Sequence, residues 1–187
     1  MPANFNAVIL EFCRVCHWAY EAWRTNRVLF DESPRADKLY HSASGPALER
    51  ICNITQEYFL LQIAKLHDPA SQKIGKVIHY NLGIDYIIKF GGWDLVTEAK
   101  LQSLQKQLDA LHQKILPARN KILSHNDLPT ILAHAVEGKF PSEADTAYFK
   151  TLEEFVNLVC EKSTGENFNF ISAVDMEIDS LASALVK

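Results

Sequence analysis

The stretch ARNKILSHND, residues 118–127, gathers side chains that could do chemistry on a phosphate. His125, with an ordinary pKa of about 6.5, can exchange a proton with a ribose 2′-hydroxyl or with a leaving 5′-oxygen. Arg119 can stabilise the charge that builds up on the phosphate, and Asn120 can orient either group. These residue types suit cleavage of RNA without a metal ion.

The same stretch also fits a purely structural role. Arg119 and Lys121 are cations near a helix C-terminus, where cations are favoured, and His125 can cap the helix or pack at its end. In one straight helix Arg119 and His125 point about 120° apart, so they do not converge. Convergence requires a helix end near Ser124 or a second copy of the chain. Because one histidine cannot conveniently act as both base and acid, a symmetric dimer that presents two is the more attractive arrangement.

Asp94 is the predicted N-cap of the longest helical pattern in the chain. Steps of three and four residues define its apolar row, which comprises Leu101, Leu104, Leu108, Leu111 and Ile115. The opposite side repeats every seven residues, at Lys100, Gln107, Lys114 and Lys121. Pro117 interrupts the pattern, so the helix must kink or restart there, at a cost of about 3 kcal/mol if nothing compensates. A restart would expose N–H groups that attract anions.

The charge is distributed unevenly along the chain, whose net charge is −4. Residues 100–125 contain five basic residues and one acid, whereas residues 126–187 contain four basic and eleven acidic residues. A phosphate-bearing ligand is therefore expected on the first window, with Lys114 and Lys121 as candidate substrate contacts. The acidic final third repels RNA unless it faces away from it.

Helical periodicity also appears outside this window, and the composition fits one domain over residues 1–187. We expect an all-α, up-and-down bundle of about five to six helices. The stretch TNRVLFDESPRADK, residues 25–38, looks polar, and residues 70–81 are expected to form a loop or short turn. Three of the other predicted helices cover residues 5–27, 82–90 and 173–185. A further helix starts between residues 36 and 46 and ends at residue 66, before Pro69, and another starts near Ser142 and Asp145.

Several chemistries are disfavoured by the sequence. Cys13, Cys16 and His17 match the Cys-x-x-Cys-His of covalent haem attachment, but both cysteines lie in the apolar row of the first helix, and no haem is expected. Matched sets of four Cys or His ligands are missing, so we expect neither a metal nor another cofactor. No segment reaches roughly 18 uninterrupted apolar residues, and the N-terminus lacks a charged secretory start. We therefore expect a cytoplasmic chain without a membrane span, its thiols reduced.

Two segments resemble a known family. RNKILSH, residues 119–125, resembles the Arg-polar-(four residues)-His motif of HEPN domains, and ILPARNKILSHND is similar to the motif of their abortive-infection AbiU-type branch. YFLLQIAKLHDPA, residues 58–70, resembles the Leu-x-Asp-Pro-like turn at a helix end of that branch. The resemblance is strongest over residues 45–130.

This resemblance implies an all-α bundle that forms a homodimer, with two motifs facing each other across a cleft. Active members are metal-independent ribonucleases, frequently toxins or phage-defence effectors. Arg119 and His125 match the catalytic pair, Asn120 matches the polar residue after the arginine, and Lys121 and Asp127 match the pattern of the branch. Other HEPN proteins only bind or assemble. The alternative is thus a non-catalytic module for a protein partner, such as an antitoxin or defence component, or for a nucleotide.

Overall fold

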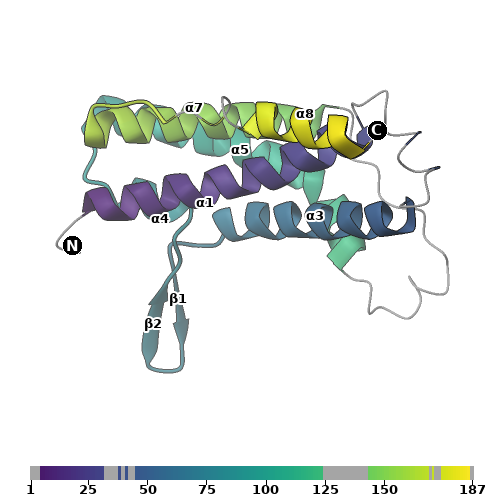
Figure 1. Ribbon diagram of the computed structural model, residues 1–187. Helices are drawn as coiled ribbons and strands as arrows, with labels where there is room; N and C mark the ends of the chain where they lie inside the picture. The colour runs from purple at the N-terminus through teal and green to yellow at the C-terminus, as the bar shows by residue number, and fades with distance from the viewer. Residues whose placement is uncertain are drawn as a thin grey trace.

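The computed structural model describes residues 5–31, 38, 41, 45–123, 143–168, 170 and 174–185. These residues form six α-helices, a π-helical segment and one β-hairpin. Long helices lie side by side, and successive ones run in opposite directions (Figure 1), which confirms the predicted up-and-down helical bundle. In chain order the elements are α1 (Phe5–Asn26), η1 (Arg27–Asp31), α3 (Gly45–Leu66), β1 (Ser71–Ile74), β2 (Val77–Tyr80), α4 (Ile84–Phe90), α5 (Leu95–Leu123), α7 (Ala144–Thr164) and α8 (Val174–Leu185).

The core lies between α1, α3, α5 and α7. Helix α1 packs against α3 and α7, and α5 packs against α7 and α3. Apolar residues at steps of three and four bring one face of each helix into this core. For α1 they include every member of the predicted row, namely Ile9, Cys13, Cys16, Tyr20 and Trp23. None of the described helices is both long and apolar enough to cross a membrane.

The prediction of a loop or short turn at residues 70–81 was wrong. Strands β1 and β2 pair antiparallel, with Ile74 opposite Val77, and form a hairpin that projects from the bundle (Figure 1). The connecting residues are Gly75 and Lys76, and Gly75 has a φ of 62°. A two-residue hairpin turn of type II′ requires a positive φ at its first central residue, which glycine adopts without strain. The β-branched residues Ile74, Val77 and Ile78 favour the extended strands on either side.

The segment after α1 also differs from the prediction of a polar stretch. η1 continues directly from α1, and its residues Val28, Leu29 and Phe30 are buried. They form a second apolar cluster with Leu48 of α3 and Ile178 of α8. The three adjacent apolar residues all find partners because two different helices cover them.

Most helix ends agree with their sequence signals. α3 ends at Leu66 before Pro69 as predicted, and Asp94 caps α5. Helix α7 begins at Ala144, close to the predicted start, but Asp145 does not cap it. The N-cap residue is instead Glu143, which has a φ of 67° and makes no side-chain cap hydrogen bond. Asp145 is buried and accepts a hydrogen bond from Trp23 Nε1 at 2.8 Å, which joins α7 to α1.

Candidate functional site

Helix α5 carries the described part of the predicted site, and Asp94 fixes where it begins. Asp94 Oδ1 accepts hydrogen bonds from the backbone N–H groups of Val96 at 3.0 Å and Thr97 at 2.9 Å. The Thr97 hydroxyl donates to Asp94 Oδ2 at 2.6 Å. These bonds satisfy N–H groups that a helix start leaves without partners, and they lower the pKa of the Asp94 carboxyl.

Two faces of α5 separate as the sequence predicted. Leu101, Leu108 and Ile115 are buried, seven residues apart. The residue before each of them is exposed, and these residues are Lys100, Gln107 and Lys114. Lys100 and Lys114 therefore lie on one solvent-facing side of the helix, where they can contact a phosphate.

The sequence predicted that the helix kinks or restarts at Pro117, and the structure shows no restart. α5 is one continuous helix through Pro117 to Leu123. A proline removes one hydrogen bond of the helical ladder, while the bonds on either side remain available. The alternative of a restart, with Pro117 as the first helical residue and free N–H groups from Ala118 to Asn120 that attract anions, is therefore wrong.

The backbone of Arg119, Asn120 and Lys121 belongs to the last turns of α5, and their side chains lie outside the described part of the structure. His125 and Asp127 also lie outside the described residues. The convergence of Arg119 and His125 thus stays a prediction. What the structure adds is that Arg119 sits on a long helix whose upstream half is fixed in the core.

A second polar cluster, which the sequence analysis missed, lies where the end of α3 meets α5 and α7. His67 follows the last residue of α3, and its Nδ1 lies 2.9 Å from Asp109 Oδ1 of α5. Its Nε2 lies 3.0 Å from the hydroxyl of Tyr148 on α7. The ring of His67 stacks on that of His112, with 4.0 Å between the centroids and 14° between the planes.

Hydrogen bonding assigns the protons of this cluster. The Asp109 carboxylate is an acceptor, so Nδ1 of His67 carries the proton and Nε2 accepts from the Tyr148 hydroxyl. Burial lowers the pKa of His67, and the nearby Asp109 opposes this only in part. Burial also raises the pKa of Tyr148 well above its usual value, so its hydroxyl remains a donor. Both groups are therefore held neutral at neutral pH.

The cluster connects three helices just upstream of the predicted motif. His112 precedes Arg119 by seven residues of α5, which in a regular helix is about 10 Å of rise and about 20° of rotation. The two positions thus share one side of the helix. The KLHDPA segment, which carries part of the family resemblance, contains His67, so that segment was the signal for the cluster. The partners of His67 could not be identified from the sequence because they lie 42 and 81 residues away from it.

The Cys-x-x-Cys-His segment packs as the sequence analysis predicted. Cys13 and Cys16 are fully buried in the core, and Cys13 Sγ lies 3.6 Å from Cys160 Sγ. Burial raises the pKa of both Cys13 and Cys16, so both remain neutral thiols. The ring of His17 packs against Phe168 and Phe170. These side chains contribute to the apolar core.

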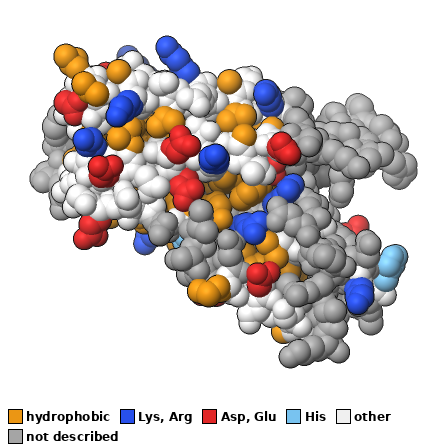
Figure 2. All heavy atoms as spheres, turned by 90° about the horizontal axis from the view of Figure 1, so that it is seen from above, with side chains coloured by type: hydrophobic (Ala, Val, Ile, Leu, Met, Phe, Trp, Pro, Cys, Tyr) orange, Lys and Arg blue, Asp and Glu red, His pale blue; other side chains and the backbone are white. Residues whose placement is uncertain are grey.

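Charge on the upper face of the bundle in Figure 1 is mixed. In the view from above Figure 1, where α7 and α8 are uppermost, Lys and Arg side chains alternate with Asp and Glu on the described surface, and hydrophobic side chains lie between them (Figure 2). That surface does not present a continuous basic field. The exposed lysines of α5 are the candidates for phosphate contacts that the sequence analysis also predicted.

Comparison with known proteins identifies the family. No curated protein and no solved structure matches the chain. A HEPN family model, described as AbiU2, matches residues 4–179 and so covers nearly all of the bundle together with the Arg119 to His125 motif. The chain belongs to the AbiU2 family of HEPN domains.

Proposed function

We propose that this abortive-infection-related HEPN domain is a metal-independent endoribonuclease that acts as a toxin or phage-defence effector. Membership of the AbiU2 family carries the proposal, because the matched region includes Arg119, Asn120 and His125 in the order and spacing of the HEPN motif. The exposed Lys100 and Lys114 on α5 support it, since they lead along the helix toward that motif.

The proposed reaction is a transfer within the RNA strand. The ribose 2′-oxygen attacks the adjacent phosphorus while one histidine accepts the 2′-hydroxyl proton. The bond from phosphorus to the 5′-oxygen breaks, and a second histidine gives that oxygen a proton. The products are a 2′,3′-cyclic phosphate and a free 5′-hydroxyl. Arg119 stabilises the charge on the phosphate, Asn120 orients the reacting groups, and Lys114, Lys121 and Asp127 contact the flanking RNA.

The two histidines come from two copies of the chain in this proposal. Each copy contributes one His125 and one Arg119 to a composite site in a homodimer. A two-fold axis then places identical motifs opposite each other, as in any isologous interface.

Cleavage is tested by incubating the purified protein with RNA in EDTA and analysing the product ends. The expected result is cyclic-phosphate ends for the wild type and a loss of at least about 100-fold for His125→Ala and Arg119→Ala. The matched controls are His79→Ala on the hairpin and Arg50→Ala on α3, both at exposed positions. Equal cleavage by all variants, or none by the wild type, would contradict the proposal.

The composite site has its own test. Unfolded wild-type and His125→Ala chains are mixed in equal amounts and refolded together, so that the two kinds of chain pair at random. If both histidines are needed, activity falls to about one quarter of that of the same total of wild type, whereas independent sites give about one half. A value of one half, or a monomer in sedimentation, would contradict the shared site.

The β1–β2 hairpin favours a second candidate function, that of a protein-binding module. All eight strand residues are exposed, and Ile74, Val77 and Ile78 are each more than half exposed on an arm that projects from the bundle. An isolated hairpin is marginally stable in water, so a partner such as an antitoxin would stabilise it. This candidate predicts that Val77→Asp abolishes recovery of a partner while leaving RNA cleavage unchanged. An unchanged set of bound proteins would contradict it.

A further inference from the structure

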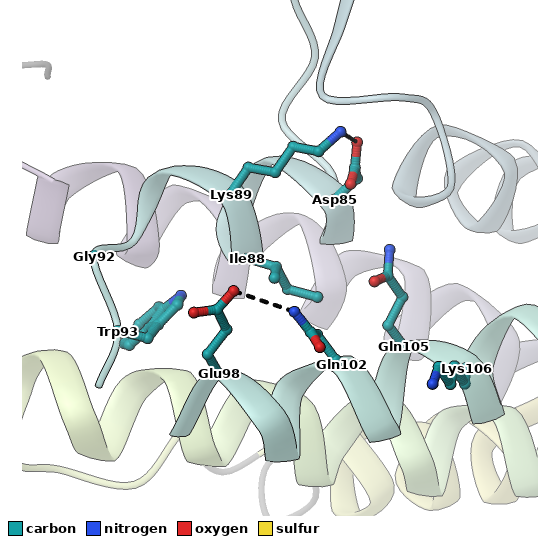
Figure 3. A pocket seen from close by; sticks show the side chains of 9 residues that line it. All are labelled: Asp85, Ile88, Lys89, Gly92, Trp93, Glu98, Gln102, Gln105 and Lys106. Atoms are coloured by element: carbon teal, nitrogen blue, oxygen red, sulfur yellow. Dashed lines mark hydrogen bonds and ion pairs between the residues drawn. The ribbon is translucent and has the colours of Figure 1, made fainter. Parts of the chain in front are cut away.

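A hollow of about 480 Å³ lies between α4 and the first half of α5, on the opposite end of α5 from the Arg119 motif. Its size is within the range of small-molecule sites. Figure 3 shows Trp93 at one end of it, then the side chains of Glu98 and Gln102 of α5, with Ile88 of α4 above these two. Gln105 and Lys106 line the other end.

Trp93 forms a fixed aromatic wall. Its indole N–H donates to the carbonyl of Ile87 at 2.9 Å. A Cβ at position 91 would lie only 2.2 Å from the indole ring, so Gly91 is required for the ring to lie against the backbone. Phe5 of α1 contacts the ring edge to face, with 6.4 Å between the centroids. The ring is therefore positioned before any ligand arrives, which lowers the entropy cost of stacking on it.

Glu98 and Gln102 supply a polar row beside this wall. Gln102 Nε2 donates to Glu98 Oε1 at 3.1 Å, which sets the carboxylate and the amide N–H next to each other (Figure 3). The row then offers two carboxylate acceptors and one amide donor. Buried Ile88 closes the apolar side of the hollow.

We propose that this hollow binds the guanine base of a nucleotide. The Watson–Crick edge of guanine presents, in this order, the N2 amino donor, the N1–H donor and the O6 acceptor. These match the two oxygens of Glu98 and the amide N–H of Gln102, while the base stacks on Trp93. Adenine and cytosine each turn a ring-nitrogen acceptor toward the carboxylate, and uracil presents two carbonyls and one N–H. Guanine is therefore the base that fits.

Lys106 supplies a charge for the phosphate. Lys89 also lines the hollow, but its ammonium is paired with Asp85 at 2.7 Å. Lys106 is exposed at the far end from Trp93, and no carboxylate of the described residues pairs with it. A base stacked on Trp93 can thus direct its ribose phosphate toward Lys106, where a charge-assisted contact forms.

This site goes beyond the proposed ribonuclease function and does not depend on it. Lys106 precedes Arg119 by thirteen residues of α5, which is about 20 Å along the helix. The hollow is therefore separate from the predicted reacting groups. Two sources can supply a guanine with a ribose phosphate, a free nucleotide and an RNA strand, and the experiment includes both.

Binding is measured by calorimetry on the full chain with His125→Ala, so that no RNA is cleaved. The probes are guanosine, inosine and adenosine monophosphates and two short single-stranded RNAs that differ by one guanine-to-adenine change. The affinity should fall from guanosine to inosine to adenosine monophosphate, by about tenfold or more between the first and the last. Inosine monophosphate should be weaker than guanosine monophosphate because it lacks the N2 amino group. If guanosine monophosphate saturates the site, the ligand is a free nucleotide. If only the guanine-containing RNA saturates it, the ligand is an RNA strand.

Variants assign the binding to the hollow. Glu98→Gln should lower the affinity for guanosine monophosphate at least about tenfold. Trp93→Phe should also lower this affinity and remove any quenching of tryptophan fluorescence by the ligand. Lys106→Ala should lower the affinity for guanosine monophosphate more than that for guanosine, which has no phosphate. Glu161→Gln, an exposed change on α7, is the matched control and should bind normally. Thermal melting verifies that each variant is folded. No saturable binding of any guanine probe, equal affinity for guanosine and adenosine monophosphates, or unchanged binding by a folded Glu98→Gln would overturn the proposal.

Discussion

The imidazole of His67 stacks on the imidazole of His112, with ring centroids 4.0 Å apart and the planes 14° from parallel. His67 follows α3, and His112 lies in the middle of α5, so this contact fixes the second half of α5 against its neighbour. A neutral His67 satisfies both of its ring nitrogens, through Asp109 and through the Tyr148 hydroxyl. A second proton on the ring, at Nε2, would break the hydrogen bond that the Tyr148 hydroxyl donates there, and the raised pKa of Tyr148 keeps that hydroxyl protonated.

We expect this arrangement to make the fold less stable in acid. Burial lowers the pKa of His67 in the folded chain, whereas the unfolded chain keeps an ordinary value of about 6.5. Below about pH 6.5 the unfolded chain therefore takes up a proton that the folded chain does not. The free energy of unfolding should fall as the pH drops below this value and level off under the folded-state pKa, with a slope from this group of at most about 1.4 kcal/mol per pH unit. Urea unfolding measured from about pH 7.5 to about pH 5 tests this.

Histidine variants separate this effect from that of other groups. His67→Gln removes the shifted group, so its unfolding free energy should depend less on pH in this window. His79→Gln, at an exposed hairpin position, should keep the wild-type dependence. A His67→Gln variant with the full pH slope would exclude His67 as the source.

The Tyr148 hydroxyl should contribute measurably to stability. Tyr148→Phe keeps the buried ring and removes only the group that His67 Nε2 accepts from. Leaving that buried nitrogen without a donor should cost about 1–3 kcal/mol at neutral pH. Tyr86→Phe on α4, a partly exposed ring, is the control and should change the unfolding free energy by less than about 0.5 kcal/mol. Equal effects of the two changes would argue against a role for the hydrogen bond.

Local patterns predicted the helices well because the signals and the structures they specify lie close together in the chain. The row from Ile9 to Trp23 predicted the buried face of α1, and Asp94 predicted the start of α5. The hairpin was missed because its strands are exposed on both faces and lack the alternation that marks a half-buried strand. Pro117 was given too much weight, since a long helix tolerates the loss of a single hydrogen bond.

The two polar sites differ in how far the sequence could specify them. Arg119 and His125 were found through the resemblance to HEPN domains, which identifies residues and gives no distances. His67 and Tyr148 have no short-range pattern that links them, because they meet only when α3 and α7 pack on α5. Contacts between distant segments depend on the whole set of helix faces, which periodicity alone does not determine.

The bond between Trp23 and Asp145 should also be important for stability. Asp145 is 1% exposed, accepts from Trp23 Nε1 at 2.8 Å, and lies 3.7 Å from the guanidinium of Arg27. Asp145→Ala leaves a buried indole N–H without that acceptor and should cost about 2–4 kcal/mol. Asp145→Asn keeps an acceptor and should cost less. Glu154→Ala, exposed on the same helix, should have little effect, and a similar loss there would contradict this assignment.

Lys114 should affect RNA binding and leave the chemical step unchanged. It is exposed on α5, one residue before buried Ile115, and faces solvent on the same side as Lys100. A lysine that contacts a phosphate of a single strand adds to the salt dependence of binding, so Lys114→Ala should reduce the slope of log affinity against log salt by about 0.7. KM for RNA cleavage should rise several-fold while kcat stays the same, because the contact is equal in ground and transition states. Lys150→Ala on α7 removes the same charge from a different helix, so it should leave both the slope and KM unchanged. If the two variants lose affinity equally, the effect comes from net charge, and the phosphate contact at Lys114 is refuted.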